Sequence, residues 1–275
     1  MKNITNNDVV YGDSLINSGR FNLHGKPISD QNGQFIIEVD PLAKSAGFSI
    51  KGTDIGATPI EDFLDRKTDS YLLAAGIGLV CNGKVILGRR PANISVMPNK
   101  LTISGGRCSE RPSITPHKEL AEEFVILASN GIEDRFVRFK FQDNIAGGLT
   151  SNEVQSLQEH AIESLSYAEQ AWAIQWLDAK VVPLHTSETK EVVITLNQHE
   201  QVVYPVAIPC IIDSYNTIDI LLPYELILPV GWEIKKVLFL ENSEKESLVA
   251  TPEQLKELES SDFTSWAWAL INTLV

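Results

Sequence analysis

The sequence predicts an α/β protein in which a mixed β-sheet lies between helices. Strand-like and helix-like segments alternate irregularly along the 275 residues, which favours a mixed sheet with helices packed on its faces. The clearest pair of strands is "AAGIGLVCNGKVILGRR" (74–90), where two apolar runs flank Asn82-Gly83, the dipeptide preferred in two-residue hairpin turns. A hydrophobic content of 43% is ordinary for a globular protein, so a sizeable core can be buried.

Apolar periodicity and capping residues predict the elements in order along the chain. The first run of the hairpin is almost continuously apolar, which predicts a central strand covered on both faces. The expected strands are 33–40, the two strands of 74–90, 101–104, 135–141, 190–196, 201–208, 209–228 and 235–241. The expected helices are 59–67, a helix that begins at Thr115 and ends near Asn130, 152–180, 251–259 and 265–274.

The same pattern suggests a division of the chain. Residues 1–68 are expected to form an N-terminal extension or a small subdomain, because their first half is polar and shows no clear period. Residues 69–275 are expected to form the main domain, with a helical insertion around 150–180. That insertion would either cover a cleft or build a homodimer contact, and the sequence does not distinguish the two.

One helix carries an unusual concentration of carboxylates. It lies in "SGGRCSERPSITPHKELAEEF" (104–124), where Thr115 is the expected N-cap and Pro116 the first helical residue. Three glutamates, Glu119, Glu122 and Glu123, fall on one side of this helix, and like charges one turn apart cost roughly 0.2–0.5 kcal/mol per pair. Magnesium takes one or two carboxylates together with water and phosphate oxygens. The residues alone therefore allow either a solvated acidic face or a site for a divalent cation.

This stretch resembles the box of the Nudix hydrolases, Gx5Ex7REUxEExGU, in which U is an aliphatic residue. The match is anchored on "KELAEEFVI", with Lys118 at the position of the family's arginine and Glu110 at the expected seven-residue gap. Ser104 and Val125 occupy the positions of the two box glycines, and Gly105-Gly106 comes two residues later than usual. The hairpin that precedes the box and "KKVLFLENSEKESLVATPEQLKEL" near the C-terminus also resemble the family.

The resemblance implies a Nudix-like mixed sheet and a Mg²⁺- or Mn²⁺-dependent hydrolase. The reaction would break a diphosphate bond in a nucleoside diphosphate that is linked to another moiety. The metal ligands and catalytic carboxylates would be Glu119, Glu122 and Glu123, assisted by Glu110. The substrate-binding residues would be Arg89, Arg90, Gly105, Gly106 and Lys118. Because side chains alternate along a strand, only one of the two arginines can face the cleft.

Two other functions stay open at this point. The altered box positions also fit a non-catalytic module that binds a nucleotide-like ligand or regulates another protein. The approach "RRPANISVMPNKLTISGG" weakly resembles the isopentenyl-diphosphate isomerases, although their cysteine and histidine pattern is not evident.

Composition restricts the partners. A net charge of −13 argues against binding to duplex nucleic acid, which needs clustered basic residues. The resemblance implies a small phosphorylated molecule as the partner. The longest apolar run is too short to span a bilayer and the first residues do not resemble a targeting signal, so a cytoplasmic protein is expected. The three cysteines lack metal-site spacing and are interpreted as free thiols.

Overall fold

The computed structural model describes residues 9–11, 30–31, 34–41, 48–50, 72–94, 97–108, 111–142, 148–170, 175–197, 200–212, 217–241 and 247–274. The strands are β1 (Val9–Tyr11), β2 (Asp30–Gln31), β3 (Gln34–Pro41), β4 (Phe48–Ile50), β5 (Leu72–Cys81), β6 (Lys84–Arg89), β7 (Leu101–Thr102), β8 (Ser104–Arg107), β9 (Phe124–Ser129), β10 (Asp134–Phe141), β11 (Trp176–Pro183), β12 (Lys190–Asn197), β13 (Glu200–Ile212), β14 (Thr217–Ile227), β15 (Glu233–Phe239) and β16 (Ser247–Ala250). The helices are α3 (Thr115–Glu123), α4 (Ser151–Glu163), α5 (Tyr167–Gln170), α6 (Pro252–Lys256), the 3-10 turn η4 (Ser260–Asp262) and α7 (Ser265–Thr273).

Strand β5 lies at the centre of a mixed sheet. It pairs in parallel with β14 and antiparallel with β6, β8 and β4. The hairpin β5–β6 turns at Asn82 and Gly83, whose φ values of 50° and 72° are those of a type I′ turn. The predicted hairpin and its central, covered strand are therefore confirmed.

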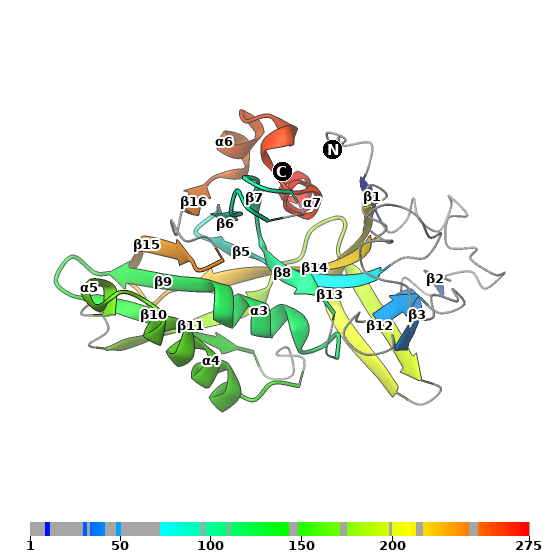
Figure 1. The fold of residues 1–275 in the computed structure, drawn as a ribbon, viewed down its shortest axis with the longest axis horizontal. Helices are drawn as coiled ribbons and strands as arrows, with labels where there is room; N and C mark the ends of the chain where they lie inside the picture. Colours follow the sequence, from blue (N-terminus) through cyan, green and yellow to red (C-terminus); the bar gives the residue numbers. More distant parts are fainter. Residues whose placement is uncertain are drawn as a thin grey trace.

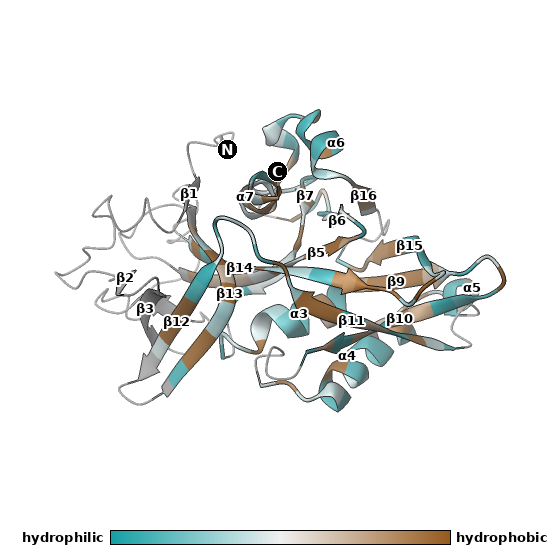
Figure 2. Ribbon diagram, turned by 180° about the vertical axis from the view of Figure 1, so that it is seen from behind, coloured by the Kyte–Doolittle hydropathy of each residue, from teal (hydrophilic) through white to brown (hydrophobic). Residues whose placement is uncertain are grey.

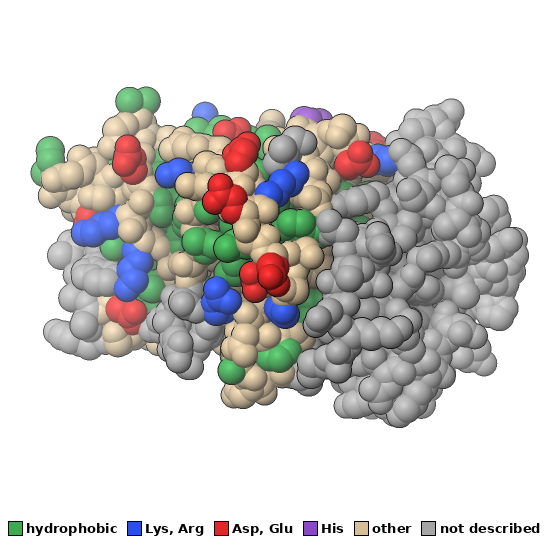
Figure 3. Space-filling model, turned by 90° about the horizontal axis from the view of Figure 1, so that it is seen from above, with side chains coloured by type: hydrophobic (Ala, Val, Ile, Leu, Met, Phe, Trp, Pro, Cys, Tyr) green, Lys and Arg blue, Asp and Glu red, His purple; other side chains and the backbone are tan. Residues whose placement is uncertain are grey.

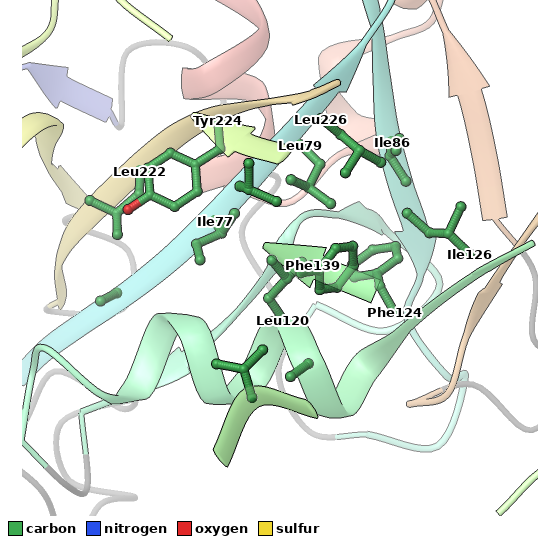
Figure 4. Close-up of a cluster of buried hydrophobic side chains, with 14 of the residues drawn as sticks. Ile77, Leu79, Ile86, Leu120, Phe124, Ile126, Phe139, Leu222, Tyr224 and Leu226 are labelled. Atoms are coloured by element: carbon green, nitrogen blue, oxygen red, sulfur yellow. The ribbon is translucent and has the colours of Figure 1, made fainter. Parts of the chain in front are cut away.

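Helices lie on both sides of this sheet, as Figure 1 shows. Helix α3 packs on one side through Leu120 and Ala121, which belong to the largest hydrophobic cluster of the core. Figure 4 shows this cluster, in which side chains from α3, β5, β9, β10 and β14 meet. Helix α7 packs on the other side through Ala267, Leu270 and Ile271. The predicted α/β fold, a mixed sheet between helices, is confirmed.

Helix α7 packs unusually close to strand β5. A Cβ atom placed on Gly78 of β5 would lie 1.9 Å from Leu270 Cδ2, so only glycine lets the helix settle this near to the strand. Similarly, a Cβ on Gly88 of β6 would lie 2.2 Å from the Phe239 ring of β15. These two glycines bring the C-terminal elements against the central hairpin.

Hydrophobic and hydrophilic residues are distributed differently over the strands and the helices. Figure 2 shows hydrophobic residues concentrated on central strands such as β5 and β9, and hydrophilic residues on α4 and α6. On the described part of the face that carries α6 and α7, acidic and basic side chains are interspersed (Figure 3). No helix in the described ranges is long and apolar enough to cross a membrane.

Two predicted helices are shorter in the structure. The acidic helix ends at Glu123, because Phe124–Ser129 forms strand β9 between β10 and β15, and most of its side chains are buried. The long helix expected over 152–180 is also wrong in its last part. Helix α4 ends at Glu163, the short α5 follows, and Trp176–Pro183 forms β11, which pairs in parallel with β10. In both cases an apolar run that fits a helical stripe pairs instead with distant strands.

Strands from the first 68 residues also join the sheet. Strand β1 pairs with β13, and β3 pairs in parallel with β12 and antiparallel with β4, which meets β5. The boundary between 1–68 and 69–275 stays a prediction, and the helix expected at 59–67 lies outside the described residues.

Candidate functional site

The acidic helix α3 places its carboxylates at an unfavourable end. The helix spans nine residues, has no acidic residue in its first turn and no basic residue in its last turn. Glu122 and Glu123 therefore stand where the helix dipole disfavours negative charge. Thr115 is not the N-cap that the sequence predicts, because the cap position belongs to Ile114 and the Thr115 hydroxyl donates to the Arg111 carbonyl. The start of the helix is thus stabilised by a preceding turn.

Two of the carboxylates meet the glycine pair of β8. The backbone N–H of Gly105 donates to Glu123 Oε2 at 3.3 Å. A Cβ atom on Gly106 would lie 2.9 Å from Glu119 Oε1, so this carboxylate presses against the glycine backbone. Gly105 itself has a φ of 153°, and a Cβ there would lie 2.6 Å from Gly76 Cα. The predicted residues Glu119, Glu123, Gly105 and Gly106 therefore lie together.

The surroundings of Glu123 disfavour its charge. Burial raises its pKa well above the usual range, and the neighbouring carboxylates of Glu119 and Glu241 raise it further. The Ser104 side chain and the Gly105 amide oppose this rise only in part. The half-buried Glu123 carboxylate is therefore unfavourable as an anion, and a bound cation would stabilise its charged form.

Three further residues belong to the sequence motif. Glu122 and Lys118 are half-buried on α3, and Glu110 lies outside the described residues. Within the described ranges, no group of three or more His, Cys, Asp or Glu side chains is arranged to hold a metal ion. The donor pair Glu119 and Glu123 nonetheless fits Mg²⁺ or Mn²⁺, which is held by one or two carboxylates with the remaining positions taken by water and phosphate.

The two predicted arginines have different surroundings. Arg89 donates from its guanidinium to the Asn99 carbonyl at 2.9 Å, so it is turned toward the loop before β7. Arg90 forms an ion pair with Glu241, with 3.3 Å between Nη2 and Oε1, and its guanidinium carbon lies 6.0 Å from the centre of the Trp266 ring. Of the two, Arg90 is the one linked to the acidic region.

Glu241 is a site residue that the sequence reasoning missed. It follows β15, and the preceding Leu240 donates its N–H to the Glu123 carbonyl at 2.8 Å. This bond joins the end of the last long strand to the end of the acidic helix. A carboxylate directly after an apolar strand is the only sequence signal at this position, and that signal is common.

Buried histidine and cysteine side chains have structural roles. His117 is fully buried, with Nδ1 3.1 Å from the Ser113 carbonyl and Nε2 3.1 Å from the Tyr224 hydroxyl, and burial lowers its pKa to about 4. The three cysteines are free and buried, as expected for structural thiols, and burial raises the pKa of Cys81 to about 11. None of these groups has the exposure that a reactive nucleophile needs.

Sequence comparison gives no relative for this chain: no family model matches it, and neither does any curated protein. Comparison of structures finds similar arrangements among solved proteins. A Nudix-family hydrolase from Clostridium perfringens has a TM-score of 0.31 and 14% identity, over 74% of this chain and 95% of that one. A protein from Deinococcus radiodurans has a TM-score of 0.32 and 14% identity, over 73% and 81% of the two chains.

A third similar structure comes from Francisella tularensis. It is a bifunctional NMN adenylyltransferase/ADP ribose pyrophosphatase complexed with AMP and a manganese ion. Its TM-score is 0.33 and its identity is 11%, over 78% of this chain and 45% of that one. At this level of similarity, the function of the present chain has to be inferred from its own residues.

Proposed function

We propose that this protein hydrolyses a diphosphate bond in a nucleoside diphosphate linked to another moiety, with Mg²⁺ or Mn²⁺ as its cofactor. The observation that carries the proposal is the half-buried pair Glu119 and Glu123, held against Gly105-Gly106 at a helix end without a basic residue. A solvated acidic face does not explain carboxylates that are packed against backbone and disfavoured by both burial and dipole.

Each residue of the candidate site has a definite role in this proposal. Glu119 and Glu123 hold the cation, and the Gly105 amide fixes the orientation of the Glu123 carboxylate. Glycine at 106 lets the Glu119 carboxylate approach the backbone, where a side chain would displace it. By their positions in the sequence motif, Glu122 is a further metal ligand, Glu110 assists the catalytic carboxylates and Lys118 contacts the substrate. When bound, the cation neutralises the diphosphate and positions an attacking water.

Turnover with a panel of nucleoside diphosphate derivatives tests this function. We expect phosphate-containing products only with Mg²⁺ or Mn²⁺, and a loss of at least roughly 100-fold in kcat for Glu123→Gln and Glu119→Gln. Glu159→Gln is the matched control, because this glutamate is exposed on α4. Activity that persists in both site variants, or in the presence of a chelator, would contradict the proposal.

A binding module without turnover is the second candidate. It is favoured by one observation, that the described residues form no group of three metal-binding side chains. Saturable nucleotide binding without product, unchanged by chelator, would identify this function. Migration of an allylic double bond in an isoprenoid diphosphate would instead identify the isomerase.

A further inference from the structure

Arg90 is held at three points, two on its side chain and one on its backbone. Its ion pair with Glu241 fixes one side, and the half-buried Trp266 lies near its guanidinium at 6.0 Å. The Arg90 backbone N–H donates to the Lys100 carbonyl at 2.9 Å, just before β7. Only 15% of the Arg90 side chain is exposed, so the charge occupies a restricted position.

The Trp266 ring is fixed by the same short strand that holds Arg90. Its indole Nε1 donates to Thr102 Oγ1 at 2.8 Å. The N-cap of α7, Thr264, donates its backbone N–H to the Leu101 carbonyl at 2.8 Å. Strand β7 therefore sets the distance between the arginine and the tryptophan, and α7 cannot shift without moving the ring.

Glu241 connects this arginine to the acidic helix. One of its oxygens, Oε1, contacts Arg90, whereas Oε2 is buried and has no hydrogen-bond partner within the described chain. The neighbouring Leu240 is bonded to the Glu123 carbonyl. Leaving a buried carboxylate oxygen without a partner is unfavourable, so a group that offsets this cost is expected close to Glu241.

We propose that Glu241 is a positioning residue of the diphosphate site, which holds the Arg90 guanidinium, backed by Trp266, at the phosphate that lies beside Glu119 and Glu123. This inference rests on the proposed function. An arginine presents a planar fork of donors that matches phosphate oxygens, and its benefit depends on a fixed orientation. The cation and Arg90 would then neutralise the diphosphate from two sides.

The chain offers a matched control for the same chemistry. Arg138 forms an ion pair with Asp178 at 2.5 Å and lies 6.0 Å from the Trp176 ring. These three residues belong to β10 and β11, and the hydrogen bonds of Arg138 go to Asp178 and to Gln155 of α4. Asp178→Asn removes the same kind of charge from an equivalent arginine at a different place.

The test measures binding of two probes to the full-length chain by calorimetry. The probes are Mn²⁺ alone and methylenediphosphonate in the presence of Mn²⁺, because the P–C–P bridge resists hydrolysis. Glu241→Gln is expected to raise the Kd of the diphosphonate roughly tenfold and to leave the Kd of Mn²⁺ within about twofold. In turnover it should raise KM and leave kcat nearly unchanged, Glu241→Asp should recover part of the affinity, and Asp178→Asn should change neither Kd.

Each other outcome has a defined meaning. A wild-type chain that turns over substrate while Glu241→Gln behaves identically overturns this inference and leaves the proposed function standing. A Glu241→Gln chain that loses Mn²⁺ affinity instead makes Glu241 a metal ligand and also overturns it. A wild-type chain that neither binds the diphosphonate nor turns over any substrate overturns both proposals. If Glu241→Gln does not fold, Arg90→Lys replaces it, with the same tenfold rise expected because the fork is lost.

Discussion

Arg90 and Arg138 have neighbours of the same kinds in two regions of this molecule. Each is paired with a carboxylate and lies 6.0 Å from a tryptophan ring. The carboxylate beside Arg138 is 51% exposed and the one beside Arg90 is 26% exposed. Arg138 also donates to the Gln155 side chain at 2.9 Å.

The difference lies in what surrounds each pair. Around Arg138 the ionic groups are partnered and close to water, as is usual for a surface pair that contributes little stability. Around Arg90 a carboxylate oxygen is buried without a hydrogen-bond partner among the described residues, next to a helix end that already carries Glu122 and Glu123. An arginine, a carboxylate and a tryptophan therefore form an ordinary surface pair in one region. In the other region the same three kinds of side chain lie beside additional carboxylates.

The largest expected effect concerns a buried carboxyl group in the central sheet. Asp219 of β14 lies opposite Ala74, which in turn lies opposite Arg107 of β8. Burial raises the pKa of Asp219 from 3.8 to about 7, with the Thr217 hydroxyl opposing this. The folded state therefore keeps this proton to a higher pH than the unfolded state, and the Asp219 contribution to stability falls as pH rises from about 4 to 7.

Asp219→Asn should remove that fall. Relative to wild type, the variant should gain on the order of 4 kcal/mol in unfolding free energy between pH 4 and pH 8. Urea unfolding of both chains at several pH values measures the difference. His117 has a lowered pKa and acts in the opposite direction below pH 6.5, but it is present in both chains and cancels. A difference that does not vary with pH would contradict the prediction.

The second effect compares the two arginines directly. Arg90→Ala should lower kcat/KM for a diphosphate substrate roughly 100-fold, since a charged contact to phosphate is lost. Arg138→Ala should change it less than about twofold. Steady-state kinetics on both variants measure this, with circular dichroism to confirm folding. Equal losses would mean that the two regions do not differ in function.

The third effect tests the close approach between β6 and β15. Gly88→Ala places a methyl group into the Phe239 ring and should cost about 1–3 kcal/mol of stability by overpacking. It should also weaken diphosphate binding, because β15 leads to Glu241. Thermal unfolding and calorimetry measure both. Gly131→Asn is the control, since nothing lies within 4 Å of that position and asparagine tolerates its φ of 84°. Comparable losses of stability and binding in both variants would show that the contact between Gly88 and Phe239 has no special role.

The smallest effect concerns the control region. Removing the Arg138 pair with Asp178→Asn should change the unfolding free energy by less than about 1 kcal/mol, and less at high salt, because the pair is partly exposed. Unfolding in low and high salt measures it. A loss of several kcal/mol in unfolding free energy that does not depend on salt would show that the Arg138–Asp178 pair behaves as a buried ion pair.

Local signals made much of the fold predictable. Asn82-Gly83 specified its hairpin because the turn depends only on those two residues. Thr251 and Gln254 form the capping box of α6, and Thr264 caps α7, so these helix starts also follow from neighbouring residues. The expected helix over 265–274 matches α7 closely for the same reason.

The failures have a common cause. Residues 124–129 form an apolar run and residues 176–180 continue a helical stripe, but both segments pair with strands that lie far away in the sequence. For the candidate site, the motif predicted Glu119, Glu123 and the two glycines, which do lie together. It could not predict Glu241, because no local spacing relates that residue to Arg90 or to the end of α3.

The dependence of Arg90 on Trp266 has a consequence for how the protein matures. The glutamates of α3 are translated well before helix α7, which lies more than 100 residues further along the chain. A nascent chain can thus present its acidic residues long before the tryptophan arrives to support the arginine. If Arg90 acts as proposed, its support is complete only when α7 has docked beside Gly78, so activity should begin after that docking step.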